Sequence, residues 1–306
     1  MKILVVSSAN MDMVLNVSSV PEAGQTVVED GKYSYVPGGK GANSAMAFKR
    51  LGADCTLVTR IGNDQNGEEL LQLYKRDGLN TDYIVRDKDA PTGLATIFVE
   101  GSGQNRIIVF AGANQKIDKA QIDGALEQMP DALYLQFEIN YDAIIYSATE
   151  AFKRGIPVFI DAGAIKPSFP FEKLPPLEMF SPNETETLTI CGIMPSDEDK
   201  CLEASRAISR LVNAKYIVIK LGGRGAYIFD GEKGAIIPTF DAKVVDTTAA
   251  GDAFTAAMTL DYLKQGNIYD ACKYGHAAGT ITVSRKGASS SIPTKDEVES
   301  FLLGKA

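Results

Sequence analysis

Short apolar runs alternate with amphipathic segments along most of this 306-residue chain. The runs are typical of strands buried on both faces of a parallel sheet, such as ILVV at 3–6, TLVT at 56–59, ALYL at 132–135 and VFI at 158–160. Helices are predicted between them, at 65–76, from Glu138 to Gly155, from Glu184 onward and at 199–213. The order predicts an α/β fold with a central, mostly parallel sheet flanked by helices, as a single domain over 1–306.

Two stretches interrupt this alternation. Residues 27–36 are predicted to be extended, and GLATIFVE, the turn GSGQNR and IIVFAGA at 93–113 predict a β-hairpin with no helix after it. We expect these pieces to form a small antiparallel β lid, discontinuous in sequence and drawn roughly from 14–36 and 92–112. The lid could cover a site at the strand ends, pair two chains, or do both.

A glycine-rich turn precedes the first predicted helix. PGGKGAN at 37–43 places three glycines in four positions, and the helix after it is predicted to stop at Gly52. The turn matches neither a Walker A loop nor the GxGxxG of a dinucleotide-binding unit. Glycines allow a ligand to approach the backbone closely, and Lys40 and Asn43 offer donors to it.

The stretch VVDTTAAGDAF at 244–254 carries the most informative chemistry. Val244 and Val245 are predicted to end a strand, and a turn of small residues then opens a helix over 251–263 that stops at Gly266. The free amides of such a helix start bind anions, phosphate above all. Asp252 is a carboxylate set into that anion site, so it either performs chemistry there or is an ordinary first-turn acid.

Further polar residues lie at predicted strand ends and helix starts, where open α/β sheets bind ligands. Asn10 and Asp12 follow the first strand and point the same way on an extended backbone, although a simple turn would explain them equally well. Glu138 follows a buried strand directly and could instead be a first-turn acid. Asn183 and Glu186 form either a helix cap or a site for water-bound Mg²⁺.

Two loops complete the set of candidate sites. The glycine hairpin KLGGRG at 220–225 is suited to lying under a flat base or near phosphates, and SRKGASSS at 284–291 could turn its carbonyl groups inward.

The formal net charge of −8 and the absence of basic blocks argue against binding to nucleic acid or membrane. The four cysteines lack CxxC spacing and no 18-residue apolar run occurs, so we expect a cytoplasmic protein with reduced thiols. Because His276 is the only histidine, general-base work falls to a carboxylate.

The arrangement of these motifs along the whole chain resembles the PfkB-type sugar kinases, and most of all their ribokinase branch. The shared motifs stand in the family's order: Asn10-x-Asp12, GGKGAN at 38–43, AGAN at 111–114, Glu138, PNETE at 182–186, DTTAAGDAF at 246–254 and RKGASSSIP at 285–293. The resemblance implies that Asp252 is the general base and that the backbone around Ala249, Ala250 and Gly251 forms the anion hole.

The resemblance also implies the binding residues. The sugar would be held by Asn10, Asp12, Gly39, Lys40, Gly41, Asn43, Glu138 and Asp252. ATP would be bound by Asn183, Lys220, Gly222, Gly223, Gly225, Gly251 and His276. Glu186 would act on Mg²⁺ through water, and a monovalent cation, K⁺, would be held at Asp246, Thr248, Thr282, Arg285, Gly287 and Ser291, largely by carbonyl groups.

The function implied by the resemblance is transfer of the γ-phosphoryl group of ATP to the 5-hydroxyl of D-ribose, in a homodimer paired through the lid. The alternatives are a kinase of another sugar or nucleoside (2-deoxyribose, fructose, a nucleoside) and a catalytically silent sugar or nucleotide sensor. One segment departs from the family pattern: 161–165 reads DAGAI where ribokinases usually carry Asn-Pro-Ala-Pro-Ala. We interpret that loop as more flexible and more acidic, with an effect on the choice of sugar rather than on the activity class.

Overall fold

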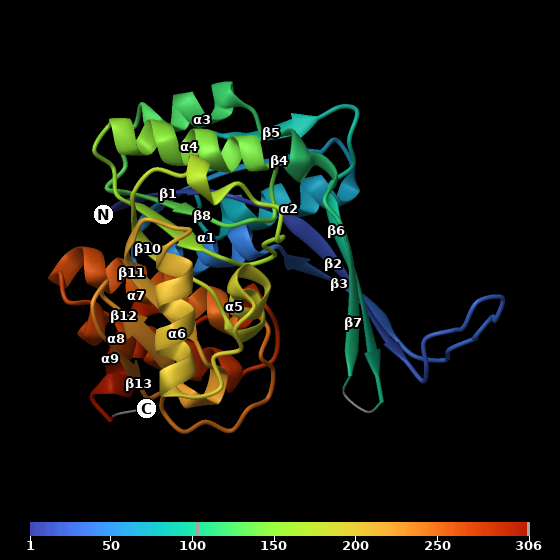
Figure 1. The fold of residues 1–306 in the computed structure, drawn as a ribbon. Coiled ribbons are helices and arrows are strands. Elements are labelled where there is room, and N and C mark those ends of the chain that lie inside the picture. Colours follow the sequence, from blue (N-terminus) through green and yellow to red (C-terminus); the bar gives the residue numbers. More distant parts are fainter. Residues whose placement is uncertain (102–103, 305–306) are drawn as a thin grey trace.

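The computed structural model describes residues 1–101 and 104–304. Its main sheet has nine strands in the order β13-β12-β11-β10-β9-β8-β1-β4-β5 (Figure 1), parallel except for the pairs β11/β12 and β12/β13. The strands are β1 (Lys2–Val6), β4 (Asp54–Gly62), β5 (Ile84–Asp87), β8 (Ala132–Leu135), β9 (Val158–Asp161), β10 (Leu177–Ser181), β11 (Ala214–Lys220), β12 (Ala226–Phe229) and β13 (Gly234–Ile237). The predicted α/β class with a mostly parallel sheet is confirmed.

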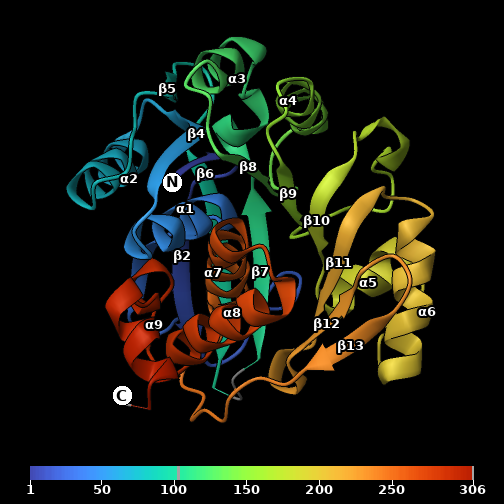
Figure 2. The same cartoon turned by 90° about the vertical axis from the view of Figure 1, so that its left-hand side faces the viewer.

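Helices cover both faces of this sheet (Figure 2). One face carries α1 (Lys40–Arg50), α2 (Gln65–Arg76), α7 (Ala250–Gln265), α8 (Ile268–Val283) and α9 (Lys295–Leu302). The other carries α3 (Lys119–Leu126), α4 (Tyr141–Lys153), α5 (Glu184–Cys191) and α6 (Glu198–Ser209). Short 3-10 turns lie at η1 (Gly112–Lys116), η2 (Phe171–Lys173), η3 (Gly222–Arg224) and η4 (Ser289–Ser291).

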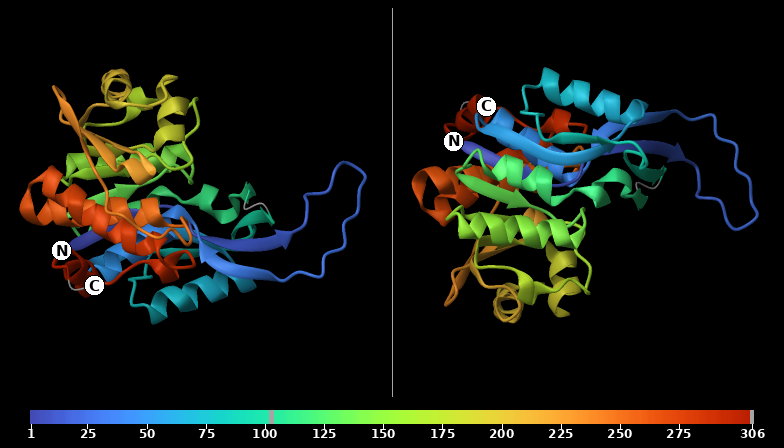
Figure 3. Two further views of the ribbon diagram at one scale, coloured as in Figure 1. Left: turned by 90° about the horizontal axis from the view of Figure 1, so that it is seen from below. Right: turned by 90° about the horizontal axis from the view of Figure 1, so that it is seen from above.

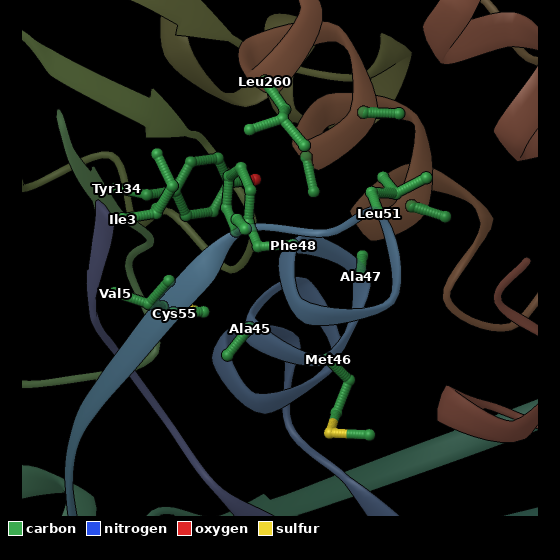
Figure 4. Close-up of a cluster of buried hydrophobic side chains, with 14 of the residues drawn as sticks. Ile3, Val5, Ala45, Met46, Ala47, Phe48, Leu51, Cys55, Tyr134 and Leu260 are labelled. Atoms are coloured by element: carbon green, nitrogen blue, oxygen red, sulfur yellow. The ribbon is translucent and has the colours of Figure 1, made fainter. Parts of the chain in front are cut away.

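The two cores follow directly from the alternation of side chains along each strand. In β1, Ile3 and Val5 belong to the core under α1 and α7, while Leu4 and Val6 belong to the core under α3 and α4. Figure 4 shows the first of these cores, where Phe48 of α1 meets Tyr134 of β8 edge to face at 5.1 Å between ring centroids. Burial on both faces explains why the strands are nearly continuous apolar runs.

The small sheet projects from the main body as a separate layer (Figure 3). Its order is β3-β2-β6-β7, from β2 (Asn10–Val17), β3 (Tyr33–Gly38), β6 (Gly93–Glu100) and β7 (Asn105–Phe110). The outer pairs β2/β3 and β6/β7 are antiparallel, and the two central strands β2 and β6 run parallel. The β6/β7 hairpin was predicted, although residues 102 and 103 of its GSGQNR turn lie outside the described part of the chain.

Three local predictions are wrong. The first strand ends at Val6, and Asn10 and Asp12 open β2 of the small sheet instead of ending β1. Residues 27–32 are not extended strand, since β3 begins only at Tyr33. Val244 and Val245 lie in a loop and are 62% and 55% exposed, because two β-formers without a neighbouring strand to pair with do not make a ladder.

Within the described ranges, every helix is too short or too polar to cross a membrane.

Candidate active site

The start of α7 is an open anion-binding site. Ala249, the residue before the helix, has a left-handed backbone (φ 61°), which is uncommon for a residue with a side chain. Strained backbones of this kind cluster at active sites. Ala250 and Ala253 donate their amides to Thr247 O and Ala249 O. In the described part of the chain no acceptor is found for the Gly251 and Asp252 amides, and Gly251 is exposed. These two N–H groups therefore face the space in front of the helix.

The Asp252 carboxylate lies one residue further along and is buried. Asn43 donates from Nδ2 to its Oδ2 at 3.0 Å, and Gln136 donates from Nε2 to its Oδ1 at 3.4 Å. Burial raises the pKa of Asp252 to about 6, against the opposing effect of the Lys40 ammonium. Asp252 is consequently ionised at neutral pH but basic enough to accept a proton, which an exposed first-turn acid is not.

The glycine turn at 38–43 brings the expected sugar-binding residues to this carboxylate. Its helix starts at Lys40, with Gly39 before it at φ 89° and so close to β2 that a Cβ would lie 2.8 Å from Asn10 N. Glu138 accepts from Ser8 Oγ at 2.5 Å and from Lys40 N at 3.1 Å. The structure therefore gathers Asn10, Asp12, Gly39, Lys40, Gly41, Asn43 and Glu138 around one place, as expected.

Asp12 carries an unused acceptor in this place. Its Oδ1 is buried and has no hydrogen-bond partner among the described residues. Burial, and then the charges of Glu138 and Asp252, raises the pKa of Asp12 to about 7. A buried oxygen without a partner is costly unless a ligand supplies the donor. A sugar hydroxyl is a donor of the right kind.

The residues expected at the nucleotide come from the start of α5, the 220–225 hairpin and α8. Asn183 and Glu186 form a complete capping box, in which Asn183 Oδ1 accepts from Glu186 N at 2.8 Å and Glu186 Oε2 accepts from Asn183 N at 2.7 Å. Asn183 is bridged to Lys220, which joins this cap to the 220–225 hairpin. Burial raises the pKa of Glu186. The first alternative for the Asn183 and Glu186 pair, a cap of α5, is thus confirmed, and the Mg²⁺ site stays a prediction.

His276 and the hairpin meet at one carbonyl group. His276 Nε2 lies 3.0 Å from Ile237 O, and a Cβ on Gly225 would lie 2.1 Å from the same oxygen. The imidazole is buried, stacks at a tilt on Phe254 and has its pKa lowered by burial to about 4. Its role toward a nucleotide would therefore be packing by a neutral ring. Gly222 and Gly223 are exposed and open to a ligand.

The expected cation site collects around Asp246. Its Oδ1 accepts from the amide and hydroxyl of Thr248 at 2.9 and 2.6 Å, and its Oδ2 accepts from Gly287 N at 3.0 Å. Burial alone would raise the pKa of Asp246, but these hydrogen bonds lower it. The side chains of Thr282, Ser291 and Arg285 are engaged with Ala278 O, Ala288 O and Glu297, which leaves mainly carbonyl groups for an ion.

Sequence reasoning missed several residues of the site. Gln136 touches Asp252 directly, and Asn114 of the AGAN motif donates from Nδ2 to Asn10 Oδ1 at 2.7 Å. Asp161 is buried at the end of β9 and forms an ion pair with Lys220 at 2.7 Å. Gln136 and Asp161 are polar residues directly after apolar runs, the same signal that pointed to Glu138. The pairing of Asp161 also gives no support for a flexible loop at that point.

The family of this chain follows from its sequence as well as its site. The model of the pfkB family carbohydrate kinases matches residues 1–295. The chain belongs to the pfkB family of carbohydrate kinases.

Individual pfkB-family relatives align over almost the whole chain. It is 33% identical to the ribokinase of Staphylococcus aureus over 301 residues, covering 97% of this chain and 98% of that protein. It is 36% identical to the bifunctional ribokinase/ribose-5-phosphate isomerase A of Fructilactobacillus sanfranciscensis, and that match covers 97% of this chain but only 55% of the longer protein. The solved structure of Arabidopsis thaliana ribokinase complexed with ribose and ATP superimposes with a TM-score of 0.90 at 30% identity, covering 98% of both chains.

The raised pKa of Asp12 gives a prediction about the stability of this pfkB-family protein. An aspartate in the unfolded chain has a pKa near 3.9, so the folded state binds this proton more tightly, and ionisation weakens the fold as pH rises from about 4 to about 7. Asp12→Asn removes that titration. We expect the free energy of unfolding of Asp12→Asn, relative to wild type, to rise by about 1–3 kcal/mol between pH 4 and pH 8.

Urea unfolding at several pH values measures this difference. The exposed Asp89→Asn is the matched control and should show no comparable change. A difference between Asp12→Asn and wild type that stays constant over the whole range would contradict the prediction.

Proposed function

We propose that this protein transfers the γ-phosphoryl group of ATP to the 5-hydroxyl of D-ribose, giving D-ribose 5-phosphate and ADP. One observation carries the proposal: the buried Asp252 carboxylate, hydrogen-bonded by Asn43 of the glycine turn, lies directly beside the open amides of the α7 start. A group that can accept a proton therefore lies next to amides that can bind an anion. The ribose and ATP in the superimposed Arabidopsis thaliana structure support the choice of both substrates.

Asp252 acts as the general base in this proposal. It accepts the proton of the 5-hydroxyl as the oxygen attacks the γ-phosphorus, and ADP leaves on the opposite side. The Gly251 and Asp252 amides, with Ala249 and Ala250 shaping the turn, stabilise the negative charge on the transferring group. Most of the catalysis is thereby positioning and electrostatics, which a helix start and one acid provide.

The unused oxygen of Asp12 supports a polyhydroxylated acceptor. Asn10, Asp12, Lys40, Asn43 and Glu138 offer several donors and acceptors close to one another. A sugar that lacks a hydroxyl leaves such a buried group without a partner, which costs up to about 10⁴ in discrimination. We therefore favour D-ribose over 2-deoxyribose.

Mg²⁺ and K⁺ fit this site in different ways. Among the described residues no cluster of three or more His, Cys, Asp or Glu side chains forms, so Mg²⁺ would depend on phosphate oxygens and water with Glu186 in the outer sphere. When bound, Mg²⁺ neutralises phosphate charge. K⁺ would be held near Asp246 by the carbonyl groups of 246–248 and 282–291 and would fix the shape of the adjoining α7 turn.

The small sheet suits a homodimer. Its two edge strands expose large apolar side chains on β3 and β7, between 51% and 66% exposed, namely Tyr33, Tyr35, Ile107, Ile108, Val109 and Phe110. Apolar edge strands of this kind are association surfaces. We include pairing of two chains through the small sheet in the proposal.

Charged substitutions on β7 test the dimer. Ile107→Glu together with Val109→Glu should convert a dimer into monomers, because a carboxylate buried at an apolar interface costs several kcal/mol. Light scattering after size-exclusion chromatography measures the mass. Leu303→Glu, an exposed apolar residue far from the small sheet, should leave the mass unchanged. A dimer that survives the β7 changes would place the interface elsewhere.

A coupled assay of ADP release tests the activity. D-ribose, 2-deoxyribose, fructose and nucleosides are compared with ATP and Mg²⁺ in buffers that contain only potassium, sodium or caesium. We expect the highest kcat/KM for ribose, with potassium above sodium. If another acceptor has a higher kcat/KM, that acceptor replaces ribose as the proposed substrate. Absence of any turnover would favour a silent sensor. Equal rates in all three buffers would contradict the proposed K⁺ site.

Asp252→Asn separates chemistry from binding. The amide keeps the shape of the side chain but cannot accept the hydroxyl proton, so kcat should fall by about 10³-fold or more while the Kd for ribose changes little. Kinetics and calorimetric titration of ribose give the two quantities. The wild-type acid limb of kcat/KM should lie near pH 6, because the base is protonated below its pKa. Rates close to wild type in Asp252→Asn would rule Asp252 out as the base.

A further inference from the structure

Asp161 has no role in the proposed reaction, yet its contacts lead directly to the α7 start. It ends β9 and is only 2% exposed. Its Oδ2 lies 2.7 Å from Lys220 Nζ and accepts from Thr255 Oγ1 at 2.9 Å. Such a short, buried, charge-assisted contact fixes the position of the lysine ammonium.

Thr255 extends this contact to the anion-binding turn. Its hydroxyl lies 2.9 Å from Asp161 Oδ2 and 3.0 Å from Gly251 O, one helical turn earlier. The buried carboxylate is thus connected through one side chain to the residue whose amide faces the phosphoryl group. Any shift of Asp161 would be transmitted to the first turn of α7.

Lys220 faces the nucleotide side of the site. Its amide donates to Pro182 O at 2.8 Å, so the lysine is anchored beside the start of α5, where Asn183 and Glu186 form the cap. Burial raises the pKa of Glu186, and the Lys220 charge acts in the opposite direction. The ammonium thus contacts Asp161 and lies within electrostatic reach of Glu186.

A purely structural explanation of the ion pair is weak. β9 and β11 are not neighbours in the sheet, since β10 lies between them, and the pair reaches across the small Ser181 at the end of β10. The backbone ladders already hold these strands together. Replacing a buried ion pair by a well-packed apolar pair is often neutral or stabilising, so stability alone does not account for this pair.

The backbone after Asp161 also supports the second lysine of the site. A Cβ on Gly163 would lie 2.4 Å from Lys40 Cδ, so the Lys40 side chain runs directly over this glycine. The Lys40 amide donates to Glu138, an expected sugar-binding residue, and Lys220 forms a backbone bridge with Asn183, an expected nucleotide-binding residue. The segment 161–163 therefore supports both cations of the site.

We propose that Asp161 is a positioning residue that holds the Lys220 ammonium beside the start of α7, where this cation neutralises charge on the phosphoryl group during transfer. The proposal rests on the proposed kinase function. Lys220 contributes the positive charge, and Asp161 sets the position of that charge. Thr255 fixes the position of Asp161 relative to Gly251. Asp161 itself touches neither substrate.

Three variants form the test: Asp161→Asn, Lys220→Met and the double variant. Asp161→Asn should lower kcat by about 10–100-fold and leave the KM for the sugar within about 3-fold. Because Asp161 acts through Lys220, the double variant should be no slower than Lys220→Met alone. The Asp161 charge also raises the pKa of Asp252, so the acid limb of kcat/KM should move to lower pH in Asp161→Asn. A merely structural role would not move that limb.

The chain offers a matched control at the opposite ends of the neighbouring strands. Lys215 of β11 pairs with Glu178 of β10 at 2.6 Å, and Lys215→Met should leave kcat and the acid limb unchanged. An unchanged kcat in Asp161→Asn, or losses that add up in the double variant, would overturn the proposal. If Asp161→Asn fails to fold, Lys220→Met decides alone, and wild-type kcat in that variant overturns it.

The test remains separate from the test of the proposed function. The acceptor that gives the highest wild-type turnover in the ADP-release assay is used, whichever sugar it is. If no acceptor is turned over, the proposed function has failed. Titration with a fluorescent ATP analogue then replaces kcat: Asp161→Asn and Lys220→Met should each weaken binding at least about 5-fold relative to Lys215→Met, and equal affinities would overturn the role of the pair.

Discussion

The hydrogen bond from Asn43 to Asp252 joins the two halves of the site, and the rest of the arrangement depends on it. Asn43 belongs to α1 and Asp252 to α7, 209 residues later in the chain. Both helices pack on the same face of the sheet, so the core under them sets the distance between the glycine turn and the anion-binding turn. Packing energy from apolar side chains thereby holds a polar contact that would not form alone.

The site concentrates negative charge and offsets only part of it. The charges of Glu138, Asp161, Glu186 and Asp252 act on Lys40, and Asp12 lies near Glu138 and Asp252. Burial raises the pKa of Asp12, Glu186 and Asp252. The Asp252 charge in turn raises the pKa of Lys40. The folded protein is therefore less stable at neutral pH than it would be without these buried acids, and groups with perturbed pKa values of this kind cluster at active sites.

The sequence predicts the parts of this molecule that depend on local patterns. The buried parallel strands, the glycine turn and the α7 start follow from apolar runs, glycine spacing and free helix amides. The ion pair of Asp161 with Lys220 could not be predicted, because it crosses β10 and depends on strand order, which no local pattern contains. For the same reason the sequence places Asn10 and Asp12 at the end of β1. In the structure β1 ends at Val6, and both residues belong to β2 of the small sheet.

That transfer changes how the site is assembled. Asn10 and Asp12 open β2, which continues as a central strand of the small sheet, whereas Asp252 is fixed to the main body by α7. Asn114 counteracts this separation, because its side chain accepts from Ala9 N at 2.9 Å and donates to Asn10 Oδ1, holding the base of β2 against η1. Any movement of the small sheet that strains this contact would shift Asn10 and Asp12 relative to Asp252. In the proposed reaction, the geometry of proton transfer would then depend on the position of the small sheet, and pairing of two chains through that sheet would also affect the chemistry.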